Sequence, residues 1–128
     1  MVIVEKRVKQ ILIVEDDKKM QDIYKIYFRD QAKKYKIEIV GSVEEATKRL
    51  AEGTFDLLIL DIIMEPVPGD SLFVYVRSIK ETRNMPIIVV SVLNPDNLWN
   101  LKAINGAKFI QKPVTKQRLL KEIKAVIG

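Results

Sequence analysis

Five short apolar runs recur along the chain and alternate with longer amphipathic segments. The runs are rich in Ile and Val, and they occupy residues 11–14, 37–40, 57–60, 87–92 and 108–111. Most of them lack the alternation of a half-exposed strand, so we interpret them as strands covered on both faces. Five strands, each followed by a helical segment, predict an α/β fold of (βα)5 order. Right-handed crossovers then place helices on both faces of a parallel sheet.

Helix signals occupy the segments between the runs. Ser42 and Glu45 form a capping box for the second helix. Asn94 with Pro95 opens a fourth helix, and Thr115 caps the last one. The first helix is predicted from one apolar stripe, made of Met20, Ile23, Tyr24, Tyr27 and Phe28. The third helix is predicted from Leu72, Phe73, Val76 and Ile79.

The size and composition of the chain suit one domain. It has 128 residues, of which 48% are hydrophobic, and no run approaches the roughly 20 apolar residues that span a bilayer. We expect a short N-terminal extension at residues 1–9, a single domain at 10–128, and no membrane partner. Cysteine is absent, which excludes disulfides and thiolate metal sites and makes the cytoplasm the expected compartment.

Histidine is also absent, and this limits the chemistry more sharply. Catalysis by Ser-His-Asp or Cys-His groups and the usual zinc sites are excluded. What remains are carboxylates, hydroxyls and lysines, and carboxylates recruit hard cations such as Mg²⁺. The net charge of +5 raises the question of nucleic acid, but the basic residues follow helical segments rather than forming a reading patch. We therefore expect no direct contact with nucleic acid.

Acidic residues follow two of the predicted strands directly. Glu15, Asp16 and Asp17 come after the first strand, and Asp61 comes after the third. In a doubly wound sheet of strand order 2-1-3-4-5, the carboxyl ends of strands 1 and 3 flank the crevice where ligands gather. Several like charges in one crevice need a neutralising partner, and a divalent cation is a suitable one.

The remaining strands bring a hydroxyl and a cation to the same edge. Ser91 ends the fourth strand, and Lys112-Pro113 follows the fifth. Taken singly, each group has an ordinary explanation: Asp16 and Asp17 as helix caps, Asp61 as a turn former, Ser91 and Lys112 as residues without a task. Their coincidence at one sheet edge instead indicates a site for phosphoryl transfer.

The four strand-end motifs, in this order, resemble those of the response-regulator receiver domain of two-component signalling. They are ILIVEDD (11–17), LLILDIIM (57–64), PIIVVS (86–91) and FIQKP (109–113), and the resemblance covers residues 10–128. It implies a flavodoxin-like three-layer sandwich. It also implies that Asp61 is the residue modified by phosphorylation, with Ser91 and Lys112 contacting the phosphoryl group.

The resemblance assigns further roles by position. Glu15 and Asp16 would hold Mg²⁺, with Asp61 and the backbone carbonyl of Ile63 as additional ligands. Lys112–Pro113 would be a cis peptide. Ser91 and Phe109 would form a switch that alters a protein-binding surface at the fourth helix, fifth strand and fifth helix. In the segment after Asp61, Glu65 occupies the position where the family usually has proline. Gly69, in contrast, is at the position where the family pattern has glycine.

The resemblance also implies the partners. A sensor histidine kinase or a histidine phosphotransfer protein would supply the phosphoryl group, because this chain has no histidine, and a downstream effector protein would read the switch. The chain would be no enzyme beyond catalysing its own phosphorylation and dephosphorylation. Two alternatives are a Mg²⁺-dependent aspartyl-phosphate phosphohydrolase and a receiver-like interaction module that works without phosphate. The phosphohydrolase would want a second Asp at position 63, which is Ile.

Two aliphatic residues flank the expected path of an attacking water. Ile63 and Leu93 lie two residues beyond Asp61 and Ser91. Neither side chain can orient water, so we hypothesise slow hydrolysis of an aspartyl phosphate in this chain.

Overall fold

The computed structural model describes residues 7–65, 67–94 and 107–128. The elements follow in the order β1 (Lys9–Val14), α1 (Lys18–Phe28), β2 (Tyr35–Val40), α2 (Val43–Glu52), β3 (Leu57–Leu60), α3 (Gly69–Ser78), β4 (Ile87–Ser91), β5 (Ala107–Gln111) and α5 (Lys116–Ile127). The predicted fourth helix, opened by Asn94 and Pro95, falls outside the described residues.

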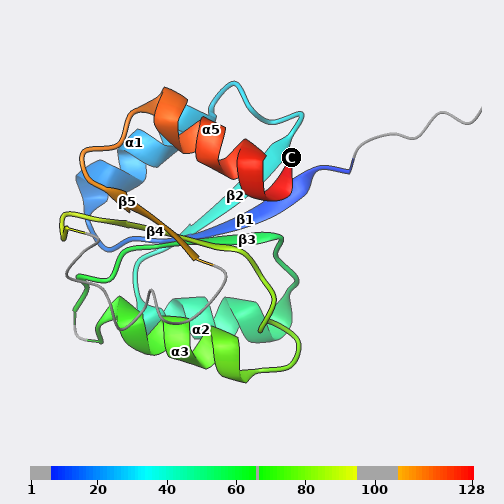
Figure 1. Ribbon diagram of the computed structural model, residues 1–128, viewed down its shortest axis with the longest axis vertical. Helices are drawn as coiled ribbons and strands as arrows, with labels where there is room; N and C mark the ends of the chain where they lie inside the picture. Colours follow the sequence, from blue (N-terminus) through cyan, green and yellow to red (C-terminus); the bar gives the residue numbers. More distant parts are fainter. Residues whose placement is uncertain (1–6, 66, 95–106) are drawn as a thin grey trace, which may run out of the picture.

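All five strands join one parallel sheet in the order β2-β1-β3-β4-β5. Helices α1 and α5 cover one face of this sheet, and α2 and α3 cover the other (Figure 1). The predicted doubly wound, flavodoxin-like sandwich is confirmed. Its strand order reverses between β1 and β3, whose carboxyl ends lie side by side because Val14 is in register with Leu60.

Each central strand contributes to two separate cores. In β1, Leu12 and Val14 pack toward α2 and α3, whereas Ile11 and Ile13 pack toward α1 and α5. All four residues are at most 1% exposed, because a strand's successive side chains point to opposite faces and both faces here are covered. This explains why the apolar runs lack alternation.

The predicted caps form as hydrogen bonds. Ser42 accepts a bond from the backbone N–H of Glu45 at 3.1 Å, and Thr115 accepts one from Arg118 N–H at 3.1 Å. The Glu45 carboxylate reaches back to the N–H of Gly41 at 3.2 Å, one residue earlier than a standard capping box. Local sequence signals therefore determine where α2 and α5 begin.

Three details differ from the sequence-based expectations. Ile23 belongs to the predicted buried stripe, yet it is 36% exposed, because α1 buries a narrower face made of Met20, Tyr24 and Phe28. Ile79 caps the end of α3 instead of lying within it. β1 begins at Lys9, within the expected extension, and Arg7 forms an ion pair with Asp56 at 2.7 Å. The chain is thus attached to the sheet from Arg7 onward.

No helix among the described residues combines the length and the apolar content that crossing a membrane requires.

Candidate functional site

The site is built at the carboxyl ends of four parallel strands. Glu15 follows β1, Asp61 follows β3, Ser91 ends β4, and Lys112 follows β5. The Asp61 N–H donates to the carbonyl of Val14 at 3.2 Å, so the ladder between β1 and β3 continues up to the acidic residues. Parallel register therefore places residues from four distant segments at one edge, as the sequence predicts.

The Lys112 ammonium joins the two acidic segments. Its Nζ lies 2.7 Å from Glu15 Oε1 and 2.9 Å from Asp61 Oδ2. Glu15 is 1% exposed and Asp61 7% exposed, so both carboxylates lie largely out of water. One cation consequently serves two buried anions, and each contact is a charge-assisted hydrogen bond.

The pKa values of Glu15 and Lys112 reflect the sharing of one ammonium between two buried carboxylates. Burial raises the pKa of Glu15, and the hydrogen bond from Lys112 opposes but does not reverse that shift. Burial lowers the pKa of Lys112, but its hydrogen bonds to Glu15 and Asp61 outweigh this and leave the pKa raised. Lys112 is therefore a permanent cation at neutral pH, in contact with two carboxylates.

Ser91 and Lys112 are tied together through the backbone. The Lys112 N–H donates to the Ser91 carbonyl at 2.7 Å, and the Ser91 hydroxyl accepts from the Leu93 N–H at 3.3 Å. Ser91 is 1% exposed, and the peptide between Lys112 and Pro113 is cis, as expected. The hydroxyl thus lies within the same buried edge as the lysine.

The loop after β3 holds the Asp61 carboxylate from its other side. Asp61 Oδ1 accepts a hydrogen bond from the Ile63 N–H at 3.0 Å, while Oδ2 faces Lys112. Gly69 closes the loop by donating its N–H to the Ile62 carbonyl at 2.9 Å. A methyl group at Gly69 would lie 2.1 Å from the Asp61 carbonyl oxygen, so only glycine allows this approach.

The acidic residues expected to bind the metal differ in burial and in hydrogen-bond partners. Glu15 and Asp61 meet at Lys112, whereas Asp16 is exposed and its Oδ2 accepts from the Glu65 N–H at 3.4 Å. Within residues 7–65, 67–94 and 107–128, no three acidic side chains converge as a metal-binding group. The donor chemistry nevertheless fits a hard cation, because carboxylate oxygens from two adjacent strand ends face one edge.

The remaining expected site residue is Phe109. It lies in β5, is half-buried, and packs against the core on the α2 and α3 side. Its partners in the expected switch surface include the fourth helix, which lies outside the described residues.

Three residues of α1 support the site, and sequence reasoning assigned none of them a role there. The Gln21 amide donates to the Glu15 carbonyl at 2.6 Å, and the Tyr27 hydroxyl donates to the Val114 carbonyl at 2.7 Å. Tyr24 is buried in the core on the α1 and α5 side; burial raises its pKa, and the charges of Glu15 and Asp61 raise it further. The apolar stripe identified both tyrosines as packing residues but gave no signal for their hydroxyls.

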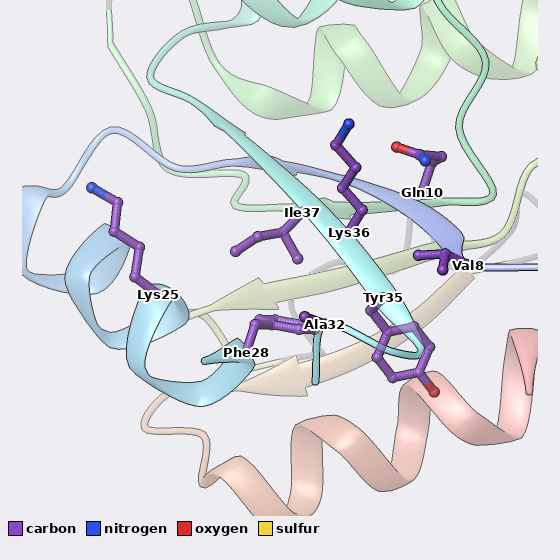
Figure 2. A pocket seen from close by; sticks show the side chains of 8 residues that line it. All are labelled: Val8, Gln10, Lys25, Phe28, Ala32, Tyr35, Lys36 and Ile37. Carbon is purple, nitrogen blue, oxygen red and sulfur yellow. The ribbon is translucent and has the colours of Figure 1, made fainter. Parts of the chain in front are cut away.

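A pocket at the amino end of β1 and along the edge strand β2 is separate from this site (Figure 2). Phe28, Ala32, Tyr35 and Ile37 supply most of its apolar wall, with Lys25 at its side. The described residues that line it include no carboxylate.

Comparison with known proteins identifies the family. The family model described as the response regulator receiver domain matches residues 11–124. The chain belongs to this family. The receiver is 29% identical over 119 residues to an uncharacterized transcriptional regulatory protein, YclJ, of Bacillus subtilis, covering 92% of this chain and 50% of that protein. It spans about half the length of the curated relatives it matches.

Solved structures show the same fold. A CheY-like response regulator receiver domain protein from Methanospirillum hungatei is 27% identical, with a TM-score of 0.80 and 93% of each chain covered. The response regulator TrrA from Thermotoga maritima, solved in complex with Mg²⁺ and BeF, is 24% identical. Its TM-score is 0.80, with 93% of the receiver and 99% of that chain covered.

Proposed function

We propose that this chain is a cytoplasmic, phospho-accepting receiver of a two-component phosphorelay, and that Asp61 takes the phosphoryl group. The observation that carries the proposal is the bridge from Lys112 to Glu15 and Asp61, at 2.7 and 2.9 Å. A buried carboxylate beside a fixed ammonium is arranged to receive a group whose charge the ammonium offsets. Membership of the receiver family supports the same reading.

The transfer exchanges one bond to phosphorus for another. A carboxylate oxygen of Asp61 attacks the phosphorus of a partner's phosphohistidine, and the P–N bond breaks as the P–O bond forms. The electron pair of the P–N bond returns to the ring nitrogen, and the imidazole leaves neutral because its other nitrogen already carries a proton. Lys112 would turn its ammonium from Asp61 Oδ2 toward a phosphoryl oxygen, and Ser91 would donate its hydroxyl to another. A sensor histidine kinase or histidine phosphotransfer protein supplies the group, and the receiver catalyses only its own phosphorylation and dephosphorylation.

Mg²⁺ is the cation that we propose for the site. Asp16 and Asp61 would hold it, with Glu15 and the Ile63 carbonyl contributing. When bound, it offsets negative charge on the phosphoryl oxygens. The oxygen donor set supports this assignment, as does the complex of the similarly folded Thermotoga maritima protein with Mg²⁺ and BeF.

The output would be a change of surface. Phosphorylation adds about −1.5 to −2 charges beside the Lys112 ammonium. Ser91 would be drawn toward the phosphoryl group, and Phe109 would turn into the space that it leaves. An effector protein would then read β5, α5 and the fourth helix, of which the last lies outside the described residues.

Intact-mass measurement tests the proposal directly. The protein is incubated with acetyl phosphate and Mg²⁺, and we expect one adduct of about 80 Da, a single phosphoryl group. Asp61→Asn should show none, and Asp70→Asn, an acidic residue in the first turn of α3, should behave as the wild type. An adduct on Asp61→Asn would overturn the assignment of the site. No adduct on the wild type would favour an interaction module that works without phosphate.

A further inference from the structure

One hydrogen bond links helix α1 to the turn that carries Lys112. The Tyr27 hydroxyl donates to the backbone carbonyl of Val114 at 2.7 Å, across 87 positions of sequence. Val114 lies two residues beyond Lys112 and is 6% exposed. The contact therefore connects the last turn of α1 with the backbone beside the site.

Apart from the ion pairs of the Lys112 side chain and the core packing of Val114, the turn between β5 and α5 has few other attachments to the described residues. It consists of residues 112–115, between the end of β5 at Gln111 and the start of α5 at Lys116. Its first residue is held by the bond from Lys112 N–H to the Ser91 carbonyl at 2.7 Å. Its last residue, Thr115, is occupied with capping α5. The carbonyl of Val114 precedes the helix, so no intrahelical donor serves it, and Tyr27 provides the bond.

A second contact reinforces the same junction. The Lys116 ammonium lies 2.8 and 2.9 Å from the two carboxylate oxygens of Asp30, which follows α1. This ion pair is exposed and contributes little by itself. The Tyr27 bond is half-buried, and its loss would leave a carbonyl without its partner beside a buried side chain.

We propose that Tyr27 is a positioning residue for Lys112. Its hydroxyl fixes the backbone of the 112–115 turn, so that the Lys112 ammonium spans Glu15 and Asp61. This inference rests on the proposed function for its consequence, which is the rate at which Asp61 is phosphorylated. Helix α1 would then contact the site at both of its ends. Its N-terminal cap, Asp17, lies close to Glu15 in the sequence, and its last turn carries Tyr27, which positions Lys112. Both α1 and α5 lie on the same face of the sheet, which allows this contact (Figure 1).

Tyr35 offers a matched control. Its hydroxyl donates to the carbonyl of Gly128 at 3.3 Å, at the opposite end of α5 from the Lys112 turn. Tyr27→Phe and Tyr35→Phe each remove one hydroxyl that bonds a backbone carbonyl. A purely structural role predicts similar behaviour for both variants, whereas positioning predicts an effect at Lys112 from Tyr27→Phe alone.

The first measurement reads Lys112 in the unphosphorylated protein. The ammonium resonance of Lys112 is followed in ¹H–¹⁵N spectra and assigned by its loss in Lys112→Met. We expect it to persist in the wild type and Tyr35→Phe and to broaden or disappear in Tyr27→Phe, because a lysine that leaves its two carboxylates exchanges protons with water faster. An unchanged resonance in Tyr27→Phe would overturn the proposal.

The second measurement is a double-mutant cycle on phosphorylation by acetyl phosphate. Tyr27→Phe should lower the second-order rate constant about fivefold, the effect of one lost hydrogen bond. In a Lys112→Met background the same change should have no further effect, because the lysine that it positions is absent. Equal slowing in both backgrounds, or equal slowing by Tyr35→Phe, would refute the role. If the wild type takes no phosphoryl group, the proposed function fails, and the resonance alone decides this inference.

Discussion

Gly69 lies where the backbone of the site leaves no room for a side chain. A Cβ at this position would meet the Asp61 carbonyl oxygen at 2.1 Å, a contact with backbone that cannot rotate away. We expect Gly69→Ala to lower the free energy of unfolding by about 1–3 kcal/mol, the usual cost of overpacking. It should also slow phosphorylation, because the Asp61 backbone must shift. Urea denaturation and the acetyl-phosphate rate measure the two effects.

Gly53→Ala is the control for that substitution. The nearest atom to a Cβ at Gly53 is the Arg49 carbonyl oxygen at 3.6 Å, an ordinary contact. We expect its free energy of unfolding to stay within about 0.5 kcal/mol of the wild type. If Gly69→Ala unfolds at the same urea concentration as Gly53→Ala, the loop after β3 is more adaptable than its packing indicates.

Ile63 determines, in our hypothesis, how long the phosphoryl group stays. Its side chain is 47% exposed, while its N–H is bonded to Asp61 Oδ1, so the side chain can face water entering the site. An aliphatic group orients no water, and Ile63→Asn should speed hydrolysis by roughly three- to tenfold, the value of about one hydrogen bond. The adduct of about 80 Da, one phosphoryl group, is followed after removal of acetyl phosphate, and its decay gives the rate of hydrolysis. An unchanged decay would end the hypothesis.

Asp56 fastens the beginning of β3 to β1, its neighbour in the sheet. Its Oδ2 accepts from the Gln10 N–H at 2.7 Å, and both its oxygens receive the Arg7 guanidinium at 2.7 and 3.0 Å. Arg7 is the main cause that holds the pKa of Asp56 below its usual range. A lowered carboxyl pKa gives stability that is present above the unfolded pKa of about 4 and is lost as the pH falls through the folded pKa.

Asp56→Asn should therefore lower stability in a pH-dependent manner. We expect a loss of about 0.5–1 kcal/mol at pH 7, discounted for the exposure of Arg7. Well below the lowered folded-state pKa of Asp56 the wild type and the variant should converge, since the carboxyl is then protonated in the folded and in the unfolded state alike. Urea denaturation at pH 7 and at that low pH measures this. Asp22→Asn, whose ion pair with Lys25 is long at 4.0 Å, should show no such convergence. An equal deficit at both pH values would assign the effect to packing instead of charge.

At this scale the sequence predicts elements well where one local signal decides. Thr115 caps α5, and the strand order follows from βα alternation, because both depend on short-range chemistry and general crossover rules. The apolar spacing predicts that Ile23 is buried, yet it lies exposed, because the width of the buried face depends on how α1 rests on the sheet. Hydrophobic periodicity alone does not specify how the helix is oriented against the sheet.

The site could be predicted as far as strand ends determine it. Glu15, Asp61, Ser91 and Lys112 each follow or end a strand, so topology alone brings them to one edge. The partner of the acids was less predictable: Lys112 spans both carboxylates, and this depends on the path of a four-residue turn. The hydrogen bond of Tyr27 cannot be predicted from the sequence. Every residue has a backbone carbonyl, and the sequence does not indicate which one a side-chain hydroxyl will reach.

For the whole molecule, the crevice concentrates negative charge that folding must tolerate. Glu15 and Asp61 share the Lys112 ammonium, and the exposed Asp16 follows Glu15 at the same strand end. A divalent cation that binds this edge in the folded state alone would stabilise the protein by mass action, by about 2.7 kcal/mol at a hundredfold excess over its dissociation constant. For a chain of 128 residues this raises the midpoint of thermal unfolding by roughly 10 °C.

We therefore expect MgCl₂ to raise the unfolding midpoint, and a chelator to reverse the rise. Differential scanning calorimetry measures it, with NaCl of matched ionic strength as the control for screening. Asp16→Asn should abolish the rise, because it removes the exposed carboxylate at the rim of the site. Asp22→Asn removes the same charge from α1 at a distance from Lys112 and should keep the rise in full. A rise that survives in Asp16→Asn would place the cation elsewhere and leave Lys112 as the only described counter-charge to Glu15 and Asp61.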